Sequence, residues 1–74
     1  MSMETGSITG TQDKHYDLLW FTEQSLSNAL RMERYAEDAE RGGDKELADF
    51  FRRAQSASKR GGEQGKELLK QRLN

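Results

Sequence analysis

The side chains that could carry chemistry are few and lie far apart along the chain. There is one histidine, His15, and no cysteine among the 74 residues. Nucleophilic catalysis of the serine type needs an imidazole beside the nucleophile, and His15 stands near an expected helix start, where we expect a solvated side chain. Four serines fall inside expected helices without a base to activate them: Ser25, Ser27, Ser56 and Ser58. We therefore expect these serines to serve as small packing residues and the protein not to be an enzyme.

Glu33 is the carboxylate whose position is hardest to explain by solvation alone. It falls on the apolar side of an expected helix, where a carboxylate must be paired, hydrated or protonated. Antiparallel packing would bring it near Arg52, which predicts a structural ion pair. The alternative is a metal site that Glu33 forms with its symmetry copy and His15. The two residues are eighteen positions apart, so they cannot ligate together within one helix, and we expect neither a metal nor a cofactor.

The charge distribution argues against binding to nucleic acid. Formal net charge is −1, and the basic residues of the second half are interleaved with acids and lack an aromatic stacking platform. Residues 13–41 hold seven acids and four bases (−3), whereas residues 44–74 hold five acids and eight bases (+3). Opposite charge on the two halves favours their packing together, modestly for each exposed pair.

The sequence shows neither a targeting segment nor a nucleotide-binding motif. No run approaches the roughly 18 apolar residues of a membrane span, and the N-terminus lacks the basic and then apolar segments of a secretory signal. We therefore expect a cytoplasmic protein with no membrane partner. The glycines at 42–43, 61–62 and 65 do not follow a predicted strand, so they do not make a phosphate-binding loop.

Hydrophobic periodicity predicts a first helix at about 13–41, capped by Asp13 or Thr11. Residues 1–12 offer only the isolated Ile8 for burial, and we expect a disordered tail there. The apolar arc of the first helix is wide enough for neighbours on two sides. Tyr16 and Trp20 lie off this arc one turn apart, as a second contact patch or as aromatics lying on their own helix.

The sequence Gly42-Gly43-Asp44 predicts a tight turn, since glycine ends helices and aspartate caps them. A second helix at about 44–72 must then run antiparallel to the first. Its three interior glycines remain in phase with its apolar side, which favours a continuous helix over a break at Gly61-Gly62. They face the segment from Leu18 to Leu26, so small residues meet large ones.

Tyr35 to Leu69 resembles the ferritin-like fold of the rubrerythrin type, and also a group of short uncharacterised bacterial proteins. The shared packing positions are Ala36, Ala39, Gly43, Leu47, Ala48, Phe51, Glu63, Leu68 and Leu69. The resemblance implies helical hairpins that pair into four-helix bundles. The positions where metal-binding members of the family carry ligands hold Ser25, Ser58 and Gly61 here, so the resemblance implies the fold without the iron chemistry.

These patterns predict an all-α protein whose domain, residues 13–74, is an antiparallel two-helix hairpin that dimerises into a four-helix bundle. A chain this short without disulfides usually needs a partner to complete its core. The residues expected in the core and dimer contact are Leu19, Leu26, Leu30, Met32, Phe50, Phe51, Leu68 and Leu69. The leading hypothesis is a non-catalytic interaction module. The alternatives are a degenerate ferritin-like metal-binding protein and an adaptor that docks on a larger protein through Tyr16 and Trp20.

Overall fold

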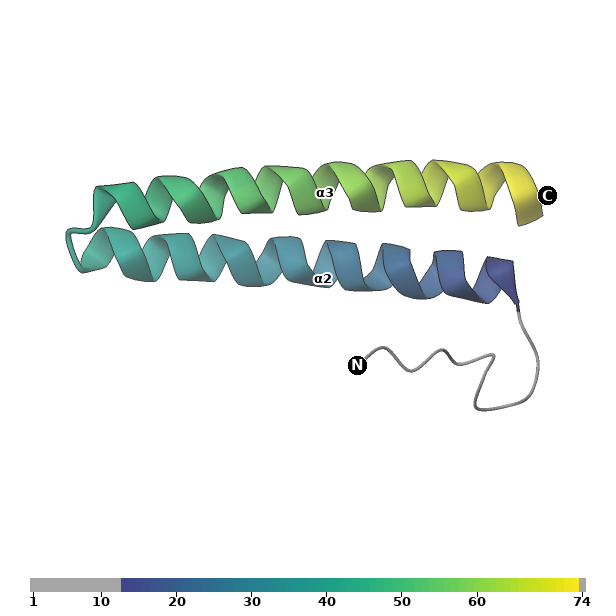
Figure 1. The fold of residues 1–74 in the computed structure, drawn as a ribbon, viewed down its shortest axis with the longest axis horizontal. Coiled ribbons are helices and arrows are strands. Elements are labelled where there is room, and N and C mark those ends of the chain that lie inside the picture. The colour runs from purple at the N-terminus through teal and green to yellow at the C-terminus, as the bar shows by residue number, and fades with distance from the viewer. Residues whose placement is uncertain (1–12, 74) are drawn as a thin grey trace.

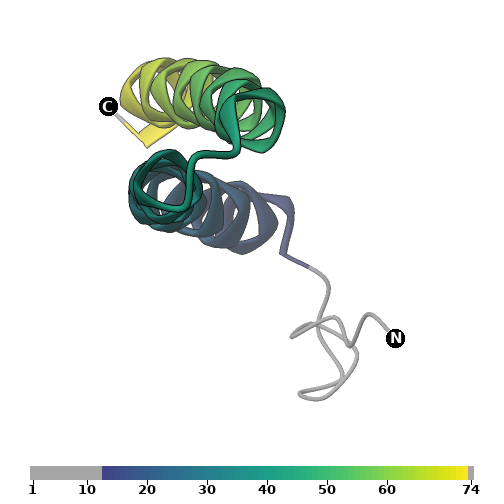
Figure 2. The same cartoon turned by 90° about the vertical axis from the view of Figure 1, so that its left-hand side faces the viewer.

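The computed structural model describes residues 13–73, which form two long helices lying side by side. Helix α2 spans Lys14–Arg41 and helix α3 spans Lys45–Leu73. They run antiparallel and are joined by a short turn (Figures 1 and 2). The predicted all-α hairpin is therefore confirmed. The tail predicted for residues 1–12, with Ile8 and Thr11, lies outside the described residues.

The start of α2 is capped by Asp13, one of the two residues predicted for that role. Its carboxylate Oδ1 accepts hydrogen bonds from the backbone N–H groups of His15 at 3.0 Å and Tyr16 at 3.2 Å. Both donors belong to the first helical turn, where backbone N–H groups have no partner inside the helix. The cap therefore fixes where α2 begins.

The turn between the helices has the chemistry that its sequence predicts. Gly43 adopts a positive φ of 78°, and its N–H donates to the Glu40 carbonyl at 2.9 Å. The Asp44 N–H donates to the Ala39 carbonyl at 2.9 Å, which completes a Schellman motif. The Asp44 carboxylate in turn accepts from the Leu47 N–H at 3.1 Å and caps α3.

Gly43→Ala is expected to lower the free energy of unfolding by about 1–2 kcal/mol, because an L-residue with a side chain is strained in the left-handed region. Gly42→Ala is the matched control, since Gly42 has an ordinary φ of −81° and should tolerate a methyl group. Urea denaturation followed by circular dichroism measures both variants. Equal losses for the two glycines would contradict this account of the turn.

Small residues fill the contact between α2 and α3. Within residues 13–73 the buried positions are Thr22, Ala29, Ala36, Ala39, Ala48, Gly62 and Gly65. Ala36 is completely inaccessible to solvent, and no large side chain in this part of the chain is fully buried. The two backbones therefore lie close together, and most large apolar side chains lie beside the contact instead of inside it.

Helix α3 continues without a break through Gly61 and Gly62, as the phase of the glycines predicts. A Cβ atom built on Gly62 would lie 2.7 Å from Leu26 Cγ, and one built on Gly65 would lie 3.1 Å from Thr22 Cβ. Both distances are shorter than a normal contact between carbon atoms. Glycine is thus required at these two positions by the close approach of α2.

The register of the hairpin is marked by two contacts between the helices. Asn28 Nδ2 donates to Ser58 Oγ at 2.7 Å near the middle of the hairpin. Closer to the turn, the rings of Tyr35 and Phe51 meet edge to face with their centroids 5.4 Å apart. These contacts place Asn28 level with Ser58 and Tyr35 level with Phe51.

Candidate functional site: an exposed apolar face

One side of the hairpin carries a row of mainly apolar residues whose large side chains the rest of the described chain leaves partly exposed. Along α3 the row follows a spacing of three and four residues, which keeps it on one side of the helix. Aromatic residues of α2 flank it. We call this surface the Phe50 face; it comprises Phe21 and Tyr35 of α2 and Leu47, Phe50, Ala54, Ala57, Gly61, Gln64 and Leu68 of α3.

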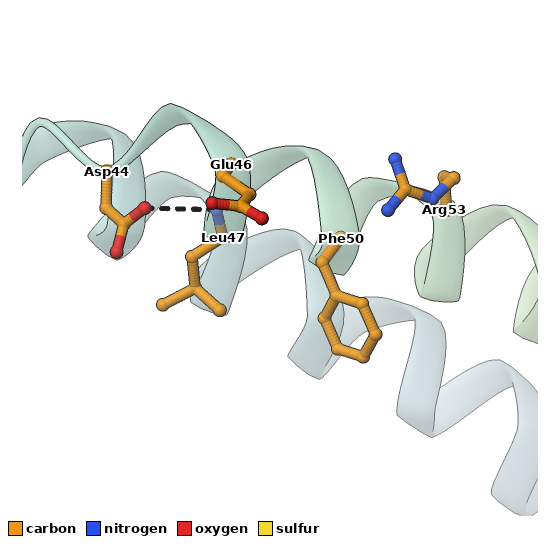
Figure 3. Close-up of a pocket in the computed structure, with 5 residues that line it drawn as sticks. All are labelled: Asp44, Glu46, Leu47, Phe50 and Arg53. Atoms are coloured by element: carbon orange, nitrogen blue, oxygen red, sulfur yellow. Dashed lines mark hydrogen bonds between the residues drawn. The ribbon is translucent and has the colours of Figure 1, made fainter.

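Contacts between the helices place the α2 residues on the same side as the α3 row. The Phe21 ring lies 3.4 Å from the position that a Cβ on Gly61 would occupy. Tyr35 and Leu47 line one shallow depression together with Phe51, and the Phe51 ring is 5.5 Å from that of Phe50. Figure 3 shows Leu47 and Phe50 projecting to the same side of α3, with Arg53 one turn beyond.

The large side chains of the Phe50 face are only partly covered. Phe21 and Phe50 are each 54% exposed, and Tyr35, Leu47 and Leu68 are 40–42% exposed. Large apolar side chains left exposed together on one side of a protein often mark contact surfaces. The face is therefore the strongest candidate for a functional site.

The residues predicted for the core divide into three groups in the structure. Leu26, Met32, Phe51 and Leu69 are partly buried beside the contact between the helices. Phe50 and Leu68 belong to the Phe50 face. Leu19 and Leu30 are exposed, by 51% and 70%, and Leu30 lies nine residues from Phe21, so the two occupy opposite sides of α2.

Phe21, Tyr35 and Leu47 are members of the Phe50 face that the predicted core set did not include. The spacing along α3 contains the signal for the row, since Leu47, Phe50, Ala54, Ala57, Gly61, Gln64 and Leu68 alternate in steps of three and four. On a helical wheel of α3, this row lies next to the row that contacts α2, which includes Ala48, Gly62 and Gly65, and the two rows form one apolar arc. Only the packing of the two helices separates them.

Tyr16 and Trp20 remain together at the exposed start of α2, 40% and 57% accessible. Trp20 lies nine residues before the buried Ala29, so it is on the side of α2 that faces away from α3. The Phe50 face and this aromatic pair are thus different surfaces. His15, at the same end of the helix, is only partly exposed.

The structure does not bring Glu33 and Arg52 together. Arg52 Nη2 is 2.7 Å from Glu40 Oε1, and Glu40 lies seven residues beyond Glu33 on the same edge of α2. Glu33 is exposed and borders a shallow depression lined also by Leu30 and Lys59. The sequence-based expectation of a buried Glu33 is therefore not met, because the edge of α2 on which it lies is open to solvent.

The three positions at which the expected ferritin-like resemblance would place metal ligands have packing roles here. Ser58 accepts the hydrogen bond from Asn28, while Gly61 lies against Phe21 and Ser25. Across residues 13–73, no three His, Asp or Glu side chains are grouped closely enough to hold a metal ion. Neither α2 nor α3 has an apolar stretch long enough to cross a bilayer.

The fold and its exposed face define a small all-α hairpin with a partly exposed apolar surface. Comparison with protein-family models, curated proteins and solved structures finds no match to the chain. The ferritin-like relationship expected from the packing positions therefore stays a prediction.

Proposed function

We propose that this protein is a non-catalytic dimerisation module in which two hairpins pair through the Phe50 face to form a four-helix bundle. The observation that carries the proposal is the exposure of the five large apolar side chains of the Phe50 face. Each is 40–54% exposed on one side of a single hairpin. The scarcity of potential catalytic groups in the sequence is consistent with a role in association.

Pairing would supply the core that one hairpin lacks. Fully burying a large apolar side chain contributes about 1.5–3 kcal/mol, and those of the Phe50 face are only partly buried in the hairpin. The buried positions between α2 and α3 are alanine, glycine and threonine, which bury little apolar surface each. A second copy placed on the Phe50 face would bury the large side chains of both chains in one contact.

Sedimentation equilibrium tests the proposal directly. The chain mass is 8.5 kDa, so a dimer has twice that mass, 17 kDa, and we expect this value at micromolar concentration. A helical protein that sediments at 8.5 kDa under the same conditions would contradict the proposal. Circular dichroism of the same sample shows whether the helices are formed.

A further inference from the structure

We infer that the two-fold axis of this dimer is perpendicular to the helices and crosses them at the level of the Asn28–Ser58 hydrogen bond. In this arrangement α3 packs antiparallel on α3 of the partner subunit, and α2 packs antiparallel on the partner's α2. The inference rests on the proposed dimer and adds its symmetry and its contacts. It follows from three features of the Phe50 face.

The first feature is the symmetric placement of the aromatic residues of α2. Phe21 lies seven residues before Asn28 and Tyr35 lies seven residues after it. A perpendicular two-fold axis at Asn28 brings Phe21 opposite Tyr35 of the partner subunit, twice in the dimer. Aromatic pairs of this kind contribute beyond the area that they bury.

The second feature is a similar symmetry in α3. Phe50 and Leu68 each lie nine residues from Lys59, one on either side. Ala57 and Gly61, which belong to the Phe50 face, lie two residues before and two residues after Lys59. An axis at the level of Lys59 therefore places Phe50 opposite Leu68 of the partner subunit, while the small residues at the centre allow the two α3 backbones to approach closely.

The two centres coincide in space although they are found independently. Asn28 donates its hydrogen bond to Ser58, the neighbour of Lys59, at 2.7 Å, so both centres lie at one level of the hairpin. A single perpendicular axis can then serve both helices, as two-fold symmetry requires. An axis parallel to the helices, which would pack α3 on the partner's α2, requires no such coincidence.

The third feature is charge beside the α3 row. Arg53 lies six residues before Lys59 and Glu67 lies eight residues after it. Both are exposed, and neither belongs to an ion pair within residues 13–73. Antiparallel packing brings Arg53 close to Glu67 of the partner subunit, so these two positions of the rim carry complementary charge, whereas Arg60 at the level of the axis lies near its own copy.

Single cysteines in this cysteine-free chain distinguish the two symmetries. In Ala57→Cys the two thiols would be offset by four residues along antiparallel helices, about 6 Å. In Gln71→Cys, further along the same row, the offset is twenty-four residues, about 36 Å. A short bis-maleimide should therefore join Ala57→Cys into covalent dimers rapidly and leave Gln71→Cys unlinked.

The mass of each variant separates failure of this inference from failure of the proposed dimer. If both variants sediment as dimers but crosslink equally, or if Gln71→Cys crosslinks faster, the perpendicular axis is overturned while the dimer stands. If the variants and the unmodified protein all sediment as monomers, the dimer itself is overturned, and the axis with it.

Charge reversal supplies a second test that is independent of thiol chemistry. Arg53→Glu and Glu67→Arg should each weaken dimerisation several-fold, because each creates two like-charge contacts across the axis. The double variant should regain the affinity of the unmodified protein. Additive weakening in the double variant would overturn the proposed register.

Discussion

Phe50→Glu is expected to raise the dissociation constant of the dimer by about 100-fold or more, and so to leave a monomer at micromolar concentration. Two-fold symmetry doubles the effect of the substitution, because two Phe50 side chains lose their contacts in every dimer. The new carboxylates would also be desolvated against Leu68 of the partner subunit, which disfavours association further. Sedimentation equilibrium over a range of concentrations measures the change.

Leu30→Glu is the matched control for this experiment. Leu30 is 70% exposed, more than the 54% of Phe50, and it lies on the opposite side of α2 from Phe21. The same change from an apolar side chain to a carboxylate should therefore leave the dissociation constant within about two-fold, since surface substitutions change free energies by about 0.5 kcal/mol or less. Equal weakening by both substitutions would show that the Phe50 face is not the contact.

Gly65→Ala is expected to lower the free energy of unfolding by about 1–2 kcal/mol, even though alanine favours helix formation over glycine by about 1 kcal/mol. The new methyl group would overlap Thr22 Oγ1 and lie 3.1 Å from Thr22 Cβ. Rotation of the Thr22 side chain can move the hydroxyl but leaves the short contact with Thr22 Cβ, so Thr22 or the helices must shift. Urea denaturation at a fixed protein concentration measures the loss.

Gly61→Ala should disturb the contact between α2 and α3 much less than Gly65→Ala does. Within one hairpin, a methyl group at Gly61 would lie 3.4 Å from the edge of the Phe21 ring, an ordinary contact, and alanine gains up to about 1 kcal/mol in helix propensity. Any loss in Gly61→Ala should therefore come from the dimer contact and depend on protein concentration. Thr22→Ala combined with Gly65→Ala should recover part of the loss, because the overlapping hydroxyl is removed. Stabilisation by Gly65→Ala alone would contradict the close approach of the helices.

The boundaries and the turn of the hairpin could be predicted because their chemistry is local. The caps at Asp13 and Asp44 and the left-handed Gly43 depend on residues within about five positions. The antiparallel direction of α3 then follows from the shortness of the turn. These features need no knowledge of which side chains meet between the helices.

The candidate site could be predicted only in part, because it depends on how closely the helices approach. The periodicity predicts Leu19 and Leu30 in the core or the dimer contact, and within one hairpin both are exposed. The buried positions between the helices are small residues, and Leu30 is left in solvent. Arg52 likewise pairs with Glu40 and not with Glu33. Periodicity places all three residues on their helices, but it does not show which carboxylate the long Arg52 side chain reaches.

The absence of any fully buried large side chain within residues 13–73 has a consequence for the life of the protein in a cell. If the large side chains are covered only when two copies meet, a newly made chain would have little protection from proteases until it found its counterpart. The half-life of the protein would then be short at low cellular concentration and longer at high concentration.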